Sequence, residues 1–333
     1  MKKILALTLV VSLTCLAAAE GLWGAEKKKI QICSASIGQS AHFFATSWAK
    51  IINTKTQNLL ATNAATGGFV ENFQLLGQGK IDVGYISVYN AFRASTGDRS
   101  LISEKEFAIL RGIYSYRVGP VHMVVLADSG IKSVSDLKGK KVTGGPAGGI
   151  TRTFLKDFLE AGGLKAGSYT EHVLSTTGGV DALKDGVVDG VCTAGLAPLP
   201  VLMDLSLMRK IRILPLEEDA IERLTQKVPS YVREVIPREL YGKNLLNEKD
   251  IVTVGSTSMA ASHKSVDPDT VYQITKVLFE NLPEFHTSHP SAKRTTLDDA
   301  FVGMVMPLHA GALKYYKEAG KTIAPRFVPP EGR

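Results

Sequence analysis

The sequence predicts an α/β protein made of two similar lobes, and two observations support this fold class. Residues 66–90 read as loop, helix, turn and buried strand, and residues 176–191 repeat that order. Both stretches contain Thr-Gly-Gly and then L-x-x-G-x-apolar-D, although we expect the second helix to be about one turn shorter. Apolar strand segments also alternate with helical segments along most of the chain, which is typical of parallel sheets covered by helices. Two such lobes, facing each other, would enclose a cleft.

The composition is that of an ordinary globular protein. The chain has 333 residues, of which 44% are hydrophobic and 21% are charged, so it can bury a full core. Its formal net charge of +7 falls to +5 without Lys2 and Lys3, and this modest positive charge would favour anionic solutes. The basic run at residues 27–29 lacks interleaved aromatic residues, and we therefore expect no nucleic-acid partner.

The first residues predict a signal for export. Two lysines precede an apolar run, residues 4–19, which ends in small residues. The run is shorter than the ~20 residues that a membrane-spanning helix needs. We therefore expect a signal peptide over residues 1–19, cleaved near Ala19, and a periplasmic protein that does not insert into the membrane afterwards. A membrane anchor, or a lipid attached at Cys15, is the alternative.

The order of the expected elements divides the mature chain into three segments. Residues 20–118 begin the first lobe, residues 119–250 cross a hinge and form the second lobe, and residues 251–333 return to the first lobe. With two crossings, the hinge would consist of extended segments, which suits a clamp that closes on a ligand.

In the first lobe we expect a strand at residues 30–33, a helix at 41–52 and a second strand at 58–63. Residues 111–114 and 121–126 predict two separate strands, of which the second would cross between the lobes.

In the second lobe, residues 140–143 predict a strand that leads through a glycine-rich loop into a helix. Residues 217–246 are predicted to be polar and helical, with interruptions at Pro229 and Pro237. Back in the first lobe, Asp267 and Pro268 provide an N-cap and a first-turn proline, and a final helix is expected at 310–319.

Polar residues are predicted to gather at one edge of the first sheet. The carboxyl ends of parallel strands and the starts of the following helices meet there, so free N–H groups and helix dipoles make that edge suitable for an anion. The alternative is that these residues only cap their helices. The residues at this edge are Ser36, Gln39, Ser40, His42, Thr66, Gly67, Gly68, Ser87, Tyr89 and Asn90.

The second lobe offers a similar edge with a glycine-rich loop at residues 144–152. This loop lacks the Lys-Ser/Thr of a P-loop, and Pro146 breaks the spacing of a dinucleotide fingerprint. What remains is a helix start that suits an anion, where Arg152 would make a bidentate contact with a carboxylate or else a surface ion pair. The end of a later strand would add Thr193 and Gly195.

No set of residues forms a convincing catalytic or metal site. His286 and His289 are close in sequence but lack a spaced carboxylate or cysteine partner, and neither G-x-S-x-G nor H-E-x-x-H occurs. Cys33 and Cys192 stand at the ends of expected strands and read as two buried free thiols, with a disulfide as the alternative. We therefore expect no metal, no cofactor and no enzymatic activity.

The chain resembles the TAXI family of solute-binding proteins, which serve tripartite ATP-independent periplasmic (TRAP) transporters. The motifs that carry the resemblance are T-G-G-x-V-E-N-x-x-L-L-x-x-G-x-I-D-V-G at 66–84, I-K-S-V-S-D-L-K-G-K-K-V at 131–142, the loop that ends in Thr151-Arg152, and L-H-A-G-A-L-K-Y-Y at 308–316. They appear in order over nearly the whole mature chain.

The resemblance implies a type II periplasmic-binding-protein fold, in which the ligand lies between two α/β lobes joined by a hinge. It also implies delivery of the solute to the permease subunits of a TRAP transporter, which an ion gradient drives; family ligands include dicarboxylates and glutamate-like amino acids. Carried over by motif, the ligand-facing residues would be Ser36, Gln39, Thr66, Gly67, Gly68, Asn72, Ser87, Tyr89, Gly148, Gly149, Thr151, Arg152, Thr193, Ala194 and Gly195.

Three functions fit these expectations. In the first, a receptor binds a small acid, Arg152 and the helix starts hold its charge, and Tyr89 or Phe43 covers its carbon frame. The second is an exported sensor subunit that uses the same clamp without transport. The third is an enzyme on the same scaffold that uses Cys192 or a histidine.

Overall fold

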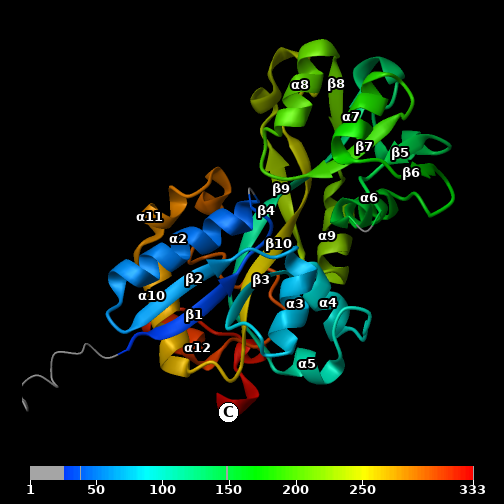
Figure 1. Cartoon of the computed structure of the whole chain (residues 1–333). Coiled ribbons are helices and arrows are strands. Elements are labelled where there is room, and N and C mark those ends of the chain that lie inside the picture. Colours follow the sequence, from blue (N-terminus) through cyan, green and yellow to red (C-terminus); the bar gives the residue numbers. More distant parts are fainter. Residues whose placement is uncertain (1–25, 38, 148, 333) are drawn as a thin grey trace, which may run out of the picture.

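The structure is a computed structural model that describes residues 26–37, 39–147 and 149–332. It consists of two α/β lobes joined by long strands (Figure 1). The expected signal peptide lies outside the described residues. Among those described, no helix combines the length and the apolar character needed to cross a bilayer.

The described strands are β1 (Lys28–Cys33), β2 (Leu59–Ala64), β3 (Val83–Ser87), β4 (Leu110–Leu126), β5 (Lys141–Thr143), β6 (Thr170–His172), β7 (Gly190–Ala194), β8 (Ile211–Leu214), β9 (Tyr231–Ile236) and β10 (Ile251–His263). The described α-helices are α2 (Ser40–Lys55), α3 (Phe69–Gly77), α4 (Val88–Ser95), α5 (Glu104–Ala108), α6 (Ile150–Ala161), α7 (Thr176–Lys184), α8 (Pro200–Met208), α9 (Glu218–Lys227), α10 (Pro268–Glu280), α11 (Leu282–His286) and α12 (Ala310–Glu318). Short 3₁₀ helices are η2 (Ala127–Ser129), η3 (Val134–Leu137), η4 (Arg238–Asn244), η5 (Pro290–Arg294), η6 (Pro325–Phe327) and η7 (Pro330–Gly332).

Both lobes have the same strand order. In lobe 1 the order is β2-β1-β3-β10-β4, and in lobe 2 it is β6-β5-β7-β4 with β8 on the other side of β4. The three leading strands of each lobe are parallel, and the strand that follows them is antiparallel. The hinge consists of β4, which pairs with β10 up to Pro120 and with β7 from Val121 onward, together with β9 and β10.

Strand β4 is continuous, which corrects the expectation of two separate strands. Gly119 and Pro120, between the two expected segments, lie where β4 exchanges the partners of lobe 1 for those of lobe 2. The carbonyl of Pro120 accepts a hydrogen bond from the N–H of Gly195 at 3.2 Å. One strand therefore belongs to both sheets.

Strand β9 is a second correction, because residues 217–246 were expected to be helical. Its two bracketing prolines, Pro229 and Pro237, delimit a six-residue strand in which Tyr231, Val232, Glu234 and Ile236 are buried. It pairs along its whole length with β10. The tertiary partner, rather than local propensity, decides this segment.

Helix α7 is a third correction. It has nine residues, the same length as α3, so the second helix is not shorter. The Thr-Gly-Gly of lobe 2 lies inside its first turn, whereas the Thr-Gly-Gly of lobe 1 precedes α3. The matching motif therefore occupies different structural positions in the two lobes.

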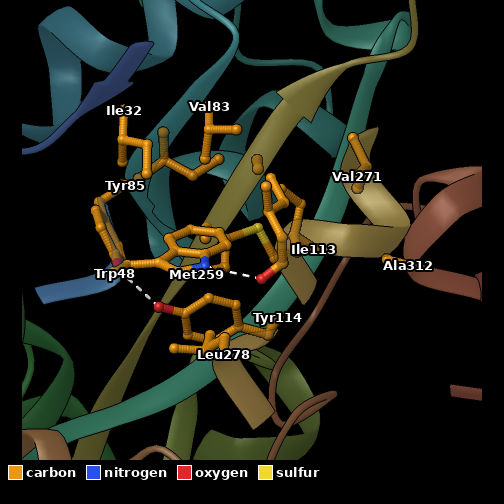
Figure 2. Packing of buried hydrophobic residues seen from close by; sticks show 14 of the residues in the cluster. Ile32, Trp48, Val83, Tyr85, Ile113, Tyr114, Met259, Val271, Leu278 and Ala312 are labelled. Atoms are coloured by element: carbon orange, nitrogen blue, oxygen red, sulfur yellow. Dashed lines mark hydrogen bonds between the residues drawn. The ribbon is translucent and has the colours of Figure 1, made fainter. Parts of the chain in front are cut away.

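The core of lobe 1 is aromatic and ties distant segments together. Trp48, Tyr85, Tyr114 and Met259 pack against one another between the sheet and the helices (Figure 2). The indole N–H of Trp48 donates to the carbonyl of Ile274 at 2.9 Å, and the hydroxyls of Tyr85 and Tyr114 lie 2.6 Å apart. These contacts fix α2 and α10 on the sheet whose edge leads to the cleft.

Candidate ligand-binding cleft

A cavity of about 530 Å³ lies between the lobes, within the range of small-molecule sites. Lobe 1 contributes Ala35, Ser36, Gln39, Ser40, Ala41, Gly67, Gly68, Phe69, Val70, Ser87 and Asn90 to its lining. The hinge strands contribute Tyr116, Val118, Ser256, Thr257 and Ser258, and lobe 2 contributes Ile150, Thr151, Phe154 and Ala194.

Four of the described helices begin at this cavity: α2, α3 and α4 from lobe 1, and α6 from lobe 2. None of the four has a side-chain hydrogen bond from its N-cap residue. The first N–H groups of an α-helix have no partner within the helix, and they carry the positive end of the helix dipole. The cavity is therefore lined by hydrogen-bond donors that suit an anion.

Of the other described α-helices, four have a side-chain cap, whereas α8, α9 and α11 have none. Ser103, Ser175, Asp267 and His309 each cap their helix by accepting a hydrogen bond from a backbone N–H. All four α-helices that begin at the cavity lack a side-chain cap, which leaves their first N–H groups open to a ligand.

Nine of the residues expected at the site line the cavity: Ser36, Gln39, Ser40, Gly67, Gly68, Ser87, Asn90, Thr151 and Ala194. They come from both lobes, as the argument from the ends of parallel strands required.

Arg152 does not line the cavity. Its Nε donates to Oε1 of Glu171 at 2.5 Å, and this pairing holds the pKa of the Glu171 carboxyl below its usual range. The surface ion pair, which was the alternative for this residue, is therefore what the structure contains. The reason lies in lobe 2 itself: β6 brings Glu171 beside the start of α6.

Tyr89 also points away from the cavity. It packs against Tyr231 with ring centroids 6.3 Å apart, among the apolar residues of lobe 2. Its neighbour Asn90, which was also expected at this edge, does line the cavity. On a helix that starts after Ser87, the third residue along shares the face of the cap, whereas Tyr89 lies on another face.

Three residues expected at the site support the loops of lobe 1 from outside the cavity. Asn72 is fully buried and donates to the carbonyls of Ser34 and Tyr85 at 2.5 and 2.8 Å, while its Oδ1 accepts from the hydroxyl of Thr66 at 2.8 Å. Nδ1 of His42 lies 3.2 Å from Nδ2 of Asn63.

The remaining residues of the expected site lie elsewhere. Phe43 stacks on His289 with ring centroids 5.6 Å apart, at the surface. Thr193 is buried in β7, and Gly195 belongs to the crossing beside Gly119. Gly149 is the N-cap of α6 but does not line the cavity, and Gly148 lies outside the described residues.

The hinge strands form a part of the cavity that the sequence did not reveal. Tyr116 is buried there against Phe44, and burial raises the pKa of its phenol. Ser256 and Ser258 face the cavity from β10. A long apolar strand gives no sign of a site in the sequence. Which of its residues face a cleft depends on pairing between distant strands, as between Ser256 and Gly119, 137 residues apart.

Cys33 and Cys192 are free and buried, as expected. Burial raises the pKa of Cys33 to about 11 and that of Cys192 still further, so both remain protonated thiols at neutral pH. Within the described residues, no group of three or more histidine, cysteine or acidic side chains is arranged to hold a metal ion.

Comparison with known proteins places the chain in a family. Residues 32–320 match the model of the NMT1-like family, and the chain therefore belongs to that family. A TctC solute binding protein from Polaromonas has a TM-score of 0.51 at 14% identity, over 81% of this chain and 87% of that chain. The periplasmic aliphatic sulphonate binding protein SsuA from Escherichia coli has a TM-score of 0.47 at 15% identity, over 92% of this chain and 97% of that chain. The likeness to the Polaromonas protein confirms the periplasmic-binding-protein fold.

Proposed function

We propose that this member of the NMT1-like family is an extracytoplasmic receptor that captures a small organic anion between its lobes and passes it unchanged to a membrane permease. The observation that carries the proposal is the meeting of four uncapped helix starts at one interlobe cavity. Such N–H groups bind an anion by hydrogen bonds and make no covalent bond to it, so the solute can be released unchanged.

The hinge supports a clamp of this kind. A side chain at Gly119, which has a φ of +153°, would place its Cβ 2.4 Å from the carbonyl carbon of Gly195. The crossing therefore depends on two glycines whose backbones touch. Tyr89 of α4 meets Tyr231 beside the cleft, so the lobes are already in contact on one side.

A binding experiment on the protein as isolated tests the proposal. Native mass spectrometry should detect a co-purified small molecule, and isothermal titration with small organic acids should give one site per chain. Thr151→Val should weaken that binding because Thr151 lines the cavity, whereas Arg152→Gln should leave it within about twofold because Arg152 is engaged by Glu171. Recovery of a chemically altered solute would contradict the receptor and favour an enzyme.

We further propose that the permease belongs to a TRAP transporter. The support is the resemblance of residues 66–84 and 308–316 to the TAXI family. Uptake of the identified solute by intact cells should then stop when ionophores collapse the ion gradients. Uptake that survives the ionophores and stops on ATP depletion would assign the receptor to another class of transporter.

A further inference from the structure

We infer, on the basis of the proposed receptor function, that the cleft selects organic anions with a single charge and an apolar body. We also infer that Asn90 recognises an uncharged polar group on that body. Dicarboxylates and glutamate-like amino acids would then be poor ligands.

The first argument is the charge of the lining. Within the described residues, the lining contains no lysine, arginine, histidine, aspartate or glutamate. A second carboxylate on the solute would have to leave water without a cationic partner, and the ammonium of an amino acid would lack a carboxylate. Helix starts and neutral side chains suffice for one anionic group.

Glu71 strengthens this argument. Its Oε2 accepts a hydrogen bond from the N–H of Gly67 at 2.5 Å, so a carboxylate already occupies part of the loop before α3. Gly67 lines the cavity. The negative charge of Glu71 beside the cavity opposes a second negative charge on the solute more than it opposes a first.

The second argument is the apolar surface that faces the cavity from both lobes. Val70 of α3 and Ile150 of α6 are 45% and 40% exposed, although each is a large hydrophobic residue in the first turn of its helix. Phe69, Val118 and Phe154 lie in the same lining. An apolar solute body would cover these side chains when the lobes hold it, which is the main source of binding free energy for such surfaces.

The third argument concerns Asn90, which is 9% exposed and lines the cavity. Its carboxamide has no hydrogen-bond partner among the described residues, in contrast to the fully bonded Asn72. Ser256, 6% exposed on β10, likewise has an unbonded hydroxyl in the described structure. Neither side chain is among the described buried atoms without a partner, so both are reached from the cavity, and a solute group that donates or accepts a hydrogen bond can bind them there.

A matched series of six-carbon solutes tests the inference by isothermal titration. The series is hexanoate, the hydroxyhexanoates, adipate and 2-aminohexanoate. We expect hexanoate to bind, at least one hydroxyhexanoate to bind more tightly, and adipate and 2-aminohexanoate to bind at least tenfold more weakly than hexanoate. Tighter binding of adipate or 2-aminohexanoate would overturn the inference and leave the proposed receptor intact. Binding of none of them would count against both.

Variants separate the role of Asn90 from the role of charge. Asn90→Leu should cost the preferred hydroxyhexanoate at least tenfold in affinity and change hexanoate by less than threefold. Asn247→Leu is the control, because Asn247 bonds only to the backbone of Ile213 in lobe 2 and lies outside the cavity. Thermal unfolding reports whether each variant is folded. A folded Asn90→Leu protein that keeps the preference for the hydroxylated solute would overturn the assignment of Asn90.

Discussion

The two lobes have the same strand order but differ in the residues that they present at the cleft. Ile32 and Val142 occupy equivalent positions, since they pair with Val83 and Gly190 in the third strands of their sheets. The same register makes Ser87 and Ala194 equivalent, each the last residue of its strand. Lobe 1 has a helix N-cap with a hydroxyl at this position, and lobe 2 has a methyl group.

The helix starts differ in the same direction. Gly68 precedes α3 without capping it, whereas Ser175, the residue at the same place before α7, caps its helix by accepting from the N–H of Gly178 at 3.1 Å. Among the described helices that begin at the cavity, three uncapped starts come from lobe 1 and one from lobe 2. If the proposed receptor function holds, this comparison predicts that lobe 1 holds the anion and that lobe 2 mainly covers the apolar part of the solute.

The largest effect is expected from Asn72, because lobe 2 has no equivalent of this buried amide. Asn72→Leu leaves the carbonyls of Ser34 and Tyr85 without a donor, which should reduce the free energy of unfolding by about 3 kcal/mol. Urea unfolding and solute titration check this, and affinity should fall at least tenfold as the loop of Thr66 moves. Asn247→Leu should lower stability by about 1 kcal/mol and leave affinity unchanged. Equal losses of affinity in the two variants would contradict a special role for the loop.

The next effect tests where the charge is held. Ser87→Asp places a carboxylate at the N-cap of α4, which suits the helix but repels an anion within a few ångströms, so affinity should fall about 100-fold. Ala194→Asp, the equivalent change in lobe 2, should cost about tenfold because a single uncapped helix start lies there. Titration of both variants with one organic acid decides the matter. If the two losses are equal, the anion is not held by lobe 1.

Lowering the pH should reduce the free energy of unfolding, because each lobe contains one buried histidine with a lowered pKa. Burial lowers the pKa of His122 in lobe 2 and of His309 in lobe 1 from 6.5 to about 4. Between these values the unfolded chain binds more protons than the folded one, so stability falls as the pH drops, by about 2 kcal/mol per histidine from pH 7 to pH 5.

Urea unfolding between pH 7 and pH 5 measures how steeply the free energy of unfolding falls with pH. His122→Gln, which removes the imidazole that lies 2.9 Å from the hydroxyl of Tyr241, should lower stability at pH 7 and reduce the slope by about half. A slope that is the same in wild type and variant would mean that His122 does not titrate in this window.

The smallest effect should be equal in the two lobes. Asp82 accepts from the N–H of Gln31 at 2.8 Å, and Asp189 accepts from the N–H of Lys141 at 2.8 Å, at equivalent positions of the repeat. Asp82→Ala and Asp189→Ala should each reduce the free energy of unfolding by about 1 kcal/mol, without an effect on solute binding. A difference larger than about 1 kcal/mol between the two variants would show that the plan is not shared at this level.

The repeat explains why much of the fold could be predicted. The aspartates 82 and 189 and the glycines 79 and 186 mark the same turn before the third strand, and Asp267 caps α10 as its position before Pro268 indicated. These signals are local, since a cap or a positive-φ glycine acts within a few residues. Strand β9 escaped prediction because its partner β10 lies 20 residues further along the chain.

The site was only partly predictable for the same reason. Ser36, Gln39 and Thr151 follow from the rule that polar residues gather where parallel strands end. Arg152 satisfied that rule too, yet Glu171 on the neighbouring strand engages it, and no sequence spacing gives that pairing. Ser256 and Tyr116 depend on how β4 and β10 cross, which is decided by the assembled sheet.

The insertion of β10 between β3 and β4 has a consequence for the order in which the chain can fold. Lobe 2 uses a continuous stretch of sequence, so it can assemble soon after its last strand has been synthesised. The sheet of lobe 1 is incomplete until residues 251–263 have been synthesised. Its buried Arg111 also lacks an ion-pair partner until Glu331, near the end of the chain, can accept from it at 2.7 Å. The half of the molecule that is made first is therefore completed last, and during synthesis it exposes an unpaired strand edge that invites aggregation.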